Sequence, residues 1–270
     1  MELQAPSRWR TADFISDLHM QASEPATFGA WRDYMLATPA EAVFLLGDVF
    51  EVWVGDDAAA EGSFEAQCGE VMREASRTRA VFFMHGNRDF LVGESFLRPA
   101  GVTLLQDPCV LAFGGKRWLL THGDALCLDD SGYMAFRAEV RSPEWQRTFL
   151  ARPLAERQAV ARGLRERSEA LKKEVAAYAD VDAPAARELM SAAGAGTMIH
   201  GHTHRPADHD LGSGLLRHVL SDWDLAASPQ RAEVLRLHSD GTAARLSWRE
   251  AENGSTSATD GPAQRPPAPG

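Results

Sequence analysis

The sequence is short of cysteine, of long apolar runs and of basic charge, and each shortage excludes a class of protein. Its three cysteines, Cys68, Cys109 and Cys127, are widely spaced, which fits neither a disulfide framework nor a zinc-binding motif. No run approaches the roughly 18 apolar residues that span a membrane, and the first residues lack the apolar core of a secretory signal. A net charge of −10 argues against a general nucleic-acid binder. We therefore expect a cytoplasmic protein that binds no nucleic acid.

What is present is an ordinary globular composition. The chain of 270 residues is 44% hydrophobic and 24% charged, which is enough to bury a large core. We expect one domain over residues 12–250, preceded by a flexible leader at 1–11. Residues 251–270 contain no large apolar side chain and are rich in Pro, Gly, Ser, Thr and Ala, so we expect a disordered tail there.

Apolar periodicity predicts strands that alternate with helices, which is the pattern of an α/β fold. Helical spacing covers residues 27–37, 62–79 and 185–193. The runs expected to form closing antiparallel strands lie at 215–220, 233–238 and 243–248.

Five short apolar runs share one kind of ending, an Asp, Asn or His that usually stands beside a glycine. The five endings are Asp17-Leu-His19, Gly47-Asp48, Gly86-Asn87-Arg88-Asp89, His122-Gly-Asp124 and His200-Gly-His202-Thr-His204. One such ending is usually structural, because a polar side chain at a strand end reaches solvent. Five endings with oxygen or imidazole groups and no thiol indicate one site, since strand ends converge on one edge of an α/β sheet.

The chemistry of these side chains indicates metal-dependent phosphate hydrolysis. Asp17 and His19 are two residues apart, so on an extended chain they lie on the same side. Oxygen and imidazole donors without thiolates suit Mn²⁺, Fe²⁺ or Mg²⁺ more than structural zinc. Two such ions about 3.5–4 Å apart can clamp an in-line phosphoryl displacement, and Asp48 is the natural bridging carboxylate. Arg88 suits bidentate contact with a phosphate, and no P-loop, nucleophile elbow or dinucleotide-binding turn competes for this role.

The loop after Asp48 leaves two interpretations open. It carries Glu51, Trp53, Asp56 and Asp57. It is either a solvated loop with Trp53 packed on the core, or a wall of supporting groups around the metals.

A helical insert at about 134–180 has a charge unlike the rest of the chain. Between Arg137 and Lys173 it holds ten Lys and Arg against five Glu, and apolar residues are threaded through it. The ordinary interpretation is a set of solvated surface helices. The other is a cap with a basic, partly apolar face, suited to an anionic amphiphile or a membrane surface.

In order and spacing, the five endings resemble the signature of the calcineurin-like metallophosphoesterases. The finer wording, such as Gly-Asp-Val-Phe-Glu-Val-Trp-Val-Gly-Asp-Asp at 47–57, resembles the branch of UDP-2,3-diacylglucosamine diphosphatases in lipid A biosynthesis, over residues 12–248. The resemblance implies an α/β fold, a β-sandwich flanked by helices with a helical cap insert. It also implies hydrolysis of the pyrophosphate of UDP-2,3-diacylglucosamine to UMP and 2,3-diacylglucosamine 1-phosphate. The family works with two Mn²⁺, peripherally on the cytoplasmic face of the inner membrane, and no obligate protein partner is implied.

The resemblance also implies roles for individual residues. By similarity, one metal is held by Asp17, His19, Asp48 and His204, and the other by Asp48, Asn87, His122 and His202. The catalytic set comprises Asp48, Asn87, Arg88 and His122. The substrate contacts comprise Asn87, Arg88, Asp130, Tyr133, Ser168, Lys172 and His202.

The insert departs from the family pattern after Ser168, where a residue is missing before Lys172. This departure concerns the part that selects the lipid. Two alternatives therefore stay open: a calcineurin-like phosphatase acting on another nucleotide or phosphoester, and a membrane-surface binding protein with a vestigial site. The second is disfavoured because every expected metal ligand is present.

Overall fold

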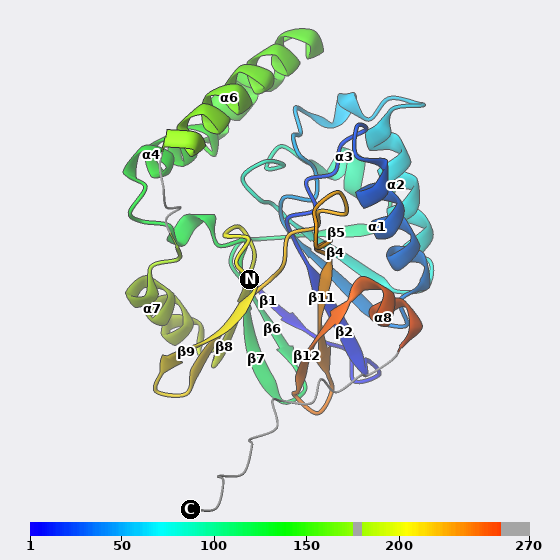
Figure 1. Ribbon diagram of the computed structural model, residues 1–270, viewed down its shortest axis with the longest axis vertical. Helices are drawn as coiled ribbons and strands as arrows, with labels where there is room; N and C mark the ends of the chain where they lie inside the picture. The colour runs from blue at the N-terminus through cyan, green and yellow to red at the C-terminus, as the bar shows by residue number, and fades with distance from the viewer. Residues whose placement is uncertain (175–179, 255–270) are drawn as a thin grey trace, which may run out of the picture.

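The structure, a computed structural model, describes residues 1–174 and 180–254, with backbone alone for residues 165–174. Two six-stranded sheets form a sandwich (Figure 1). In order across the first sheet the strands are β12 (Ala243–Ser247), β11 (Glu233–His238), β2 (Thr11–Ile15), β3 (Ala42–Leu46), β4 (Ala80–Met84) and β5 (Val102–Leu105). Across the second they are β1 (Glu2–Gln4), β6 (Cys109–Phe113), β7 (Lys116–Leu120), β8 (Thr197–His200), β10 (Leu215–Val219) and β9 (Ala207–Gly212).

The strand sequences build the interface between the sheets. Strands β2 to β5 are parallel, and Phe14, Phe44 and Phe82 stand in register on neighbouring strands. Their rings stack with centroids 4.7 and 4.6 Å apart and pack in the core shared with the second sheet. The next residues along the strands, such as Ile15 and Leu45, point to the opposite face and join a separate core beneath the helices, as the two-residue period of a strand requires.

Helices cover the outer faces of both sheets. The flanking helices are α1 (Pro25–Ala37), α2 (Phe64–Ala75), α3 (Glu94–Leu97), α7 (Ala183–Ala193) and α8 (Trp248–Asn253). Helices α1, α2 and α8 contribute to the core on the first sheet. Helix α7 packs on the second, where Ala186 and Met190 share a core with Leu119 and Met198. This arrangement is the α/β sandwich that the sequence predicts.

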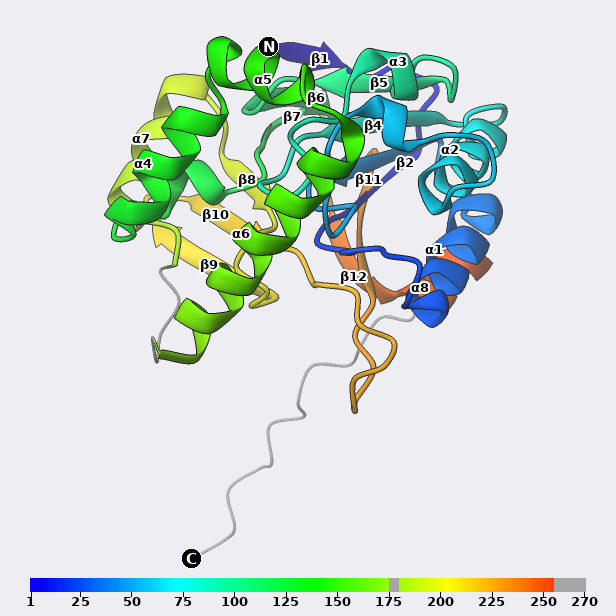
Figure 2. The same cartoon turned by 90° about the horizontal axis from the view of Figure 1, so that it is seen from above.

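The expected insert forms three helices at one end of the sandwich (Figures 1 and 2). They are α4 (Ser131–Val140), α5 (Pro143–Leu150) and α6 (Leu154–Glu174). Helix α6 is tied to the body by Arg157, whose guanidinium is buried and pairs with Asp57 and the Val54 carbonyl. No helix in the described part of the chain is both long and apolar enough to cross a membrane.

The structure corrects the expected ends of the domain. The prediction of a flexible leader is wrong, because Glu2–Gln4 pairs in parallel with β6 and Trp9 is buried in the core between the sheets. The prediction of a disordered tail at 251–270 starts too early in the chain. Residues 251–253 belong to α8, and a capping box at Ser247 begins this helix. Residues 255–270 lie outside the described residues.

Candidate metal centre

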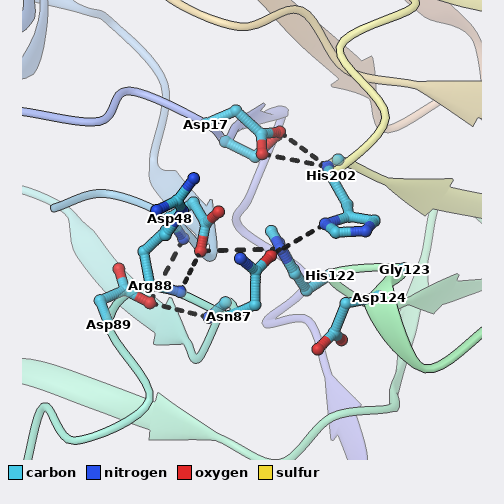
Figure 3. A network of polar contacts seen from close by, with 12 residues as sticks. Asp17, Asp48, Asn87, Arg88, Asp89, His122, Gly123, Asp124 and His202 are labelled. Atoms are coloured by element: carbon cyan, nitrogen blue, oxygen red, sulfur yellow. Dashed lines mark hydrogen bonds and ion pairs between the residues drawn. The ribbon is translucent and has the colours of Figure 1, made fainter. Parts of the chain in front are cut away.

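Strands from both sheets deliver the predicted residues to one edge of the sandwich. Strands β2, β3 and β4 are parallel neighbours in the first sheet, and β7 and β8 are parallel neighbours in the second. Pairing continues into the loops, where the His19 amide donates to the Asp48 carbonyl and the Gly201 amide donates to the His122 carbonyl, each at 3.0 Å. Figure 3 shows the resulting convergence of Asp17, Asp48 and His122 with side chains from the other loops. The endings therefore converge as the sequence predicts, but they come from two sheets and not from the single sheet expected.

The loops achieve this convergence with strained backbone. Six non-glycine residues in the described chain have positive φ, and five of them are predicted ligands: Asp17, His19, Asp48, His202 and His204. Their φ angles lie between 47° and 69°. Left-handed backbone costs a non-glycine residue roughly 1–3 kcal/mol, and such strain gathers at functional sites. The strain therefore marks this edge independently of the side-chain chemistry.

Two glycines allow the loops to approach one another. Gly47 has a φ of +90°, and a Cβ there would lie 2.6 Å from the Gly86 amide nitrogen. A Cβ on Gly86 would collide with the carboxylate and the amide of Asp48. These positions need glycine because the Asp48 and Asn87 loops pass with no room for a side chain.

Asp17, His19 and His204 form a first donor group. One donor atom from each lies within 4.8 Å of the others. The Nε2 atoms of His19 and His204 are 3.1 Å apart, and His204 Nε2 is 3.4 Å from Asp17 Oδ1. Convergent imidazole nitrogens and a carboxylate oxygen are suitable ligands for a divalent cation.

Asn87, His122 and His202 form a second donor group. Asn87 Oδ1 lies 3.0 Å from His122 Nε2 and 2.9 Å from His202 Nδ1 (Figure 3). Asp48 stands between the two groups, with Oδ1 3.7 Å from His122 Nε2 and Oδ2 3.9 Å from His19 Nε2. Each oxygen of this carboxylate thus faces one donor group, as a bridging ligand would.

Oxygen atoms of neighbouring groups lie on the far side of three imidazole rings. His122 Nδ1 lies 2.9 Å from the Leu46 carbonyl, which can only accept, so Nδ1 carries a proton. His19 Nδ1 lies 3.1 Å from Glu51 Oε2, and His204 Nδ1 lies 3.9 Å from Asp222 Oδ2. In these three residues Nε2 faces the centre, which is the arrangement that supporting acceptors impose on metal-binding histidines.

The centre concentrates negative charge out of solvent. Asp17, Asp48, Asp89 and Asp124 are each at most 2% exposed. Burial opposes ionisation of Asp17, but a hydrogen bond with His204 and the charge of His122 hold its pKa well below the usual value. Burial and the neighbouring Asp48 raise the pKa of Asp89 to about 6. Uncompensated buried carboxylates are costly, so the oxygen and imidazole donors fit divalent cations both in chemistry and in charge.

Two of the imidazoles have opposite pKa shifts. Burial works to lower the pKa of His122, but the carboxylates of Asp48, Asp17 and Asp124 overcome it and raise the pKa to about 9. Burial and the positive charge of His122 lower the pKa of His202 to about 4. His122 therefore holds a proton at neutral pH when no cation is bound, whereas His202 does not.

Two buried carboxylates support the loops, and the sequence analysis assigned neither a site role. Asp89 accepts from the backbone amides of Val49 and Gly86, each at 2.8 Å, and so ties the Asp48 loop to the Asn87 loop. Asp124 accepts from the Tyr133 hydroxyl at 2.6 Å and from Arg137 Nε at 2.8 Å. Their place within the Gly-Asn-Arg-Asp and His-Gly-Asp endings was the available signal.

Each of the two interpretations of the acidic loop holds for some of its residues. Trp53 is buried against Phe96, and Asp56 accepts from the Trp53 indole nitrogen at 3.1 Å, so both shape the loop. Asp57 pairs with Arg157 of the cap. Glu51 alone of the four contacts a residue of the donor groups, at His19.

The expected substrate contacts are only partly brought together. The Tyr133 ring stacks on His202, with centroids 6.0 Å apart. Asp130 is exposed and caps α4 by accepting from the Tyr133 amide at 2.8 Å. Ser168 and Lys172 lie on α6, and their side chains fall outside the described residues.

Comparison with known proteins gives a family match and curated relatives. The family model for calcineurin-like phosphoesterases matches residues 11–206. Proteins named UDP-2,3-diacylglucosamine hydrolase from Chromohalobacter salexigens and Chromobacterium violaceum are 43% and 45% identical to this chain over 237 and 219 residues. These alignments cover 85% and 78% of this chain, and 94% and 89% of the relatives. The family match thus spans both donor groups and Asp48.

Proposed function

This chain belongs to the calcineurin-like phosphoesterase family, and we propose that it hydrolyses the pyrophosphate bond of UDP-2,3-diacylglucosamine in lipid A biosynthesis. The products are UMP and 2,3-diacylglucosamine 1-phosphate. The convergence of two donor groups on Asp48, in a chain similar over most of its length to UDP-2,3-diacylglucosamine hydrolases, carries the proposal.

We propose two Mn²⁺ ions as the cofactors, with Mg²⁺ or Fe²⁺ as possible substitutes. Asp17, His19, His204 and one oxygen of Asp48 would hold one ion. Asn87, His122, His202 and the other oxygen of Asp48 would hold the second. Bound there, such ions polarise phosphoryl oxygens and lower the pKa of an attacking water.

The protein's own groups orient the pyrophosphate. Arg88 lies next to Asn87 in the same loop, and its backbone amide donates to Asp48 Oδ1 at 2.8 Å. The Nη1 atom of its guanidinium lies 3.7 Å from Glu51 Oε1, and we propose that this group binds a phosphoryl oxygen beside the donor groups. Water attacks the phosphorus on the uridine side, the bond from that phosphorus to the bridging oxygen breaks, and the sugar leaves as its 1-phosphate. Because the leaving group is a phosphate, it departs without a strong proton donor.

The cap offers a place for the lipid part. A cavity of about 280 Å³ lies between the loop after Asp48, α2 and α6. Its lining is mostly apolar and comprises Val52, Trp53, Val54, Ala58 and Ala161, together with Glu65, Gln158 and Arg162. We propose that this cavity takes acyl chain, and that Asp130 and Tyr133 contact the sugar, with Ser168 and Lys172 of α6.

Exposed side chains on the three cap helices support our proposal of a peripheral location on the inner membrane. The large apolar side chains of Phe136, Leu150 and Leu164 are more than a third exposed on α4, α5 and α6. Exposed Arg147 and Arg152 lie close to Leu150 in the sequence. Apolar and cationic groups together bind anionic lipid surfaces.

The test is release of UMP from UDP-2,3-diacylglucosamine by metal-stripped protein, before and after Mn²⁺ is restored. We expect UMP only with Mn²⁺, and none once a chelator is added. Cleavage of a generic phosphodiester without cleavage of the lipid would retain the metal chemistry but refute the substrate. Failure to cleave either compound with any divalent cation would refute the enzyme assignment.

A further inference from the structure

Glu51 lies between the metal centre and the proposed phosphate-binding arginine. Its Oε2 atom is 3.1 Å from His19 Nδ1, and its Oε1 atom is 3.7 Å from Arg88 Nη1. The side chain is only 12% exposed. The two oxygens of one carboxylate thus face a predicted metal ligand and a predicted substrate ligand.

Backbone hydrogen bonds hold Glu51 in this position on both sides. On the His19 side, the Met20 amide donates to the Val49 carbonyl at 3.0 Å, and the Glu51 amide donates to the Met20 carbonyl at 3.1 Å. On the Arg88 side, the Trp53 amide donates to the Arg88 carbonyl at 3.1 Å. The three loops are therefore pinned to one another around this carboxylate.

Each contact has a physical consequence for its partner. A carboxylate at Nδ1 of an imidazole fixes the ring orientation and makes the opposite nitrogen a better metal ligand. For Arg88, a nearby carboxylate restricts a long and flexible side chain, so less conformational entropy is lost when a phosphate binds. Glu51 can therefore act on metal binding and on substrate binding without touching either.

The two other candidate ligand histidines whose Nδ1 lies on the side away from the centre, His122 and His204, do not share this double connection. His122 is oriented by a backbone carbonyl, at Leu46. His204 is 3.9 Å from Asp222, whose carboxylate is bound by Arg231 Nε at 3.0 Å. Arg231 lies in a different loop from Arg88, and no contact between Arg231 and the donor groups is seen in the described chain.

We propose that Glu51 is a positioning residue that couples the two functions of the site, by orienting His19 for the cation and Arg88 for the substrate phosphate. The Arg88 half rests on the proposed hydrolase function. The His19 half concerns cation binding alone and can be tested without any substrate.

The first experiment measures Mn²⁺ binding to metal-stripped protein by titration calorimetry. The variant Glu51→Gln keeps the size of the side chain and removes its charge. We expect Mn²⁺ affinity to fall about 10- to 100-fold at one of two sites, the usual effect of removing a supporting carboxylate. Glu188→Gln, which removes an exposed carboxylate on α7, is the matched control and should bind Mn²⁺ as the parent does.

The second experiment is a double-mutant cycle on KM at saturating Mn²⁺, with Glu51→Gln and Arg88→Met. If Glu51 acts through Arg88, its substitution raises KM about tenfold in the parent and little in the Arg88→Met background. Thermal melting of the metal-stripped variants separates an effect on KM that acts through Arg88 from a general loss of stability. A general loss of stability would change KM equally in the parent and in the Arg88→Met background.

The outcomes are distinguishable from failure of the proposed function. Parent-like Mn²⁺ binding by Glu51→Gln overturns the His19 half, and fully additive effects on KM overturn the Arg88 half. If UDP-2,3-diacylglucosamine is not cleaved by the parent, the cycle is run on bis(p-nitrophenyl) phosphate. Weakened Mn²⁺ binding with non-additive KM on that compound supports the coupling even though the lipid substrate is refuted.

Discussion

Binding of a metal cation should release a proton from His122, and pH is the perturbation that reveals it. The pKa of this buried imidazole is about 9 because the carboxylates of Asp48, Asp17 and Asp124 outweigh the effect of burial. In the metal-stripped protein at pH 7 the ring is therefore about 99% protonated. A cation needs the lone pair on Nε2, so the proton must leave when it binds.

The magnitude follows from the pKa. At pH 7 the cation must displace a proton from His122, whose pKa is about 9. This competition weakens the apparent affinity of the protein for Mn²⁺ by about 100-fold, or about 2.7 kcal/mol. Mn²⁺ affinity should therefore rise about tenfold per pH unit from pH 7 to 8 and level off above 9. Calorimetry at pH 7 in buffers of different ionisation enthalpy should count at least one proton released per protein molecule.

The same shift sets how the stability of metal-stripped protein depends on pH. The folded pKa of His122 lies above the value of about 6.5 for an unfolded chain, so its contribution is complete below pH 6.5. This contribution of His122 is lost as pH rises towards 9, and the free energy of unfolding then falls by up to about 3 kcal/mol. Mn²⁺ affinity that does not change between pH 7 and 8, or binding without proton release, would refute this reasoning.

Four further predictions concern single residues of the candidate site, the core and the cap. Asp48→Ala removes the carboxylate that faces both donor groups, so turnover should fall by several orders of magnitude while the circular dichroism spectrum remains that of the folded protein; near-normal turnover would contradict the dinuclear assignment. Gly86→Ala places a Cβ against Asp48, so activity should be lost together with Mn²⁺ binding by calorimetry, and retention of both would show that the loops can separate. Arg236→Met leaves the fully buried Asp13 without its bidentate partner, so urea denaturation should show a loss of about 3–5 kcal/mol, and a loss below 1 kcal/mol would mean that Asp13 is neutralised in another way. Lys172→Glu should raise KM for the lipid substrate more than it lowers kcat, and unchanged kinetics would exclude the lysine from substrate binding.

The strands that end in the candidate ligands could be predicted because their sequences are locally distinctive. Strand β3 (Ala42–Leu46) is buried at every position and β4 (Ala80–Met84) at all but its first, so both appear as short apolar runs ended by glycine or histidine. Parallel strands that are buried on both faces leave this signature. Sheet geometry predicts that the endings of neighbouring parallel strands meet at one edge, but it does not predict that a second sheet brings His122 and His202 to the same place.

The elements that were missed depend on partners far away in the sequence. Strand β1 has three residues and little pattern of its own, and it forms because Glu2–Gln4 pairs with β6. Strand β9 contains Asp208, His209 and Asp210, a polar sequence that becomes a strand at the edge of a sheet by pairing with β10. Local propensity cannot report such pairings, because the stabilising contacts come from another part of the chain.

The supporting carboxylates were missed for a related reason. Asp89 and Asp124 have no solvent exposure, and although they stand within two of the five endings, their residue type alone is also that of an ordinary acidic turn residue. Glu51, Asp56 and Asp57 share one acidic loop but contact different partners, namely the candidate ligand His19, Trp53 within the loop and Arg157 of the cap, respectively. Only the three-dimensional neighbours separate these roles.

The most direct test of the central claim is hydrolysis of UDP-2,3-diacylglucosamine in water labelled with heavy oxygen, with Mn²⁺ added to metal-stripped protein. Mass spectrometry of the two products then locates the bond that is cleaved. The account predicts one labelled oxygen in UMP, none in the sugar 1-phosphate, and no product when Mn²⁺ is withheld. Label in the sugar 1-phosphate, or equal hydrolysis without a divalent cation, would contradict it.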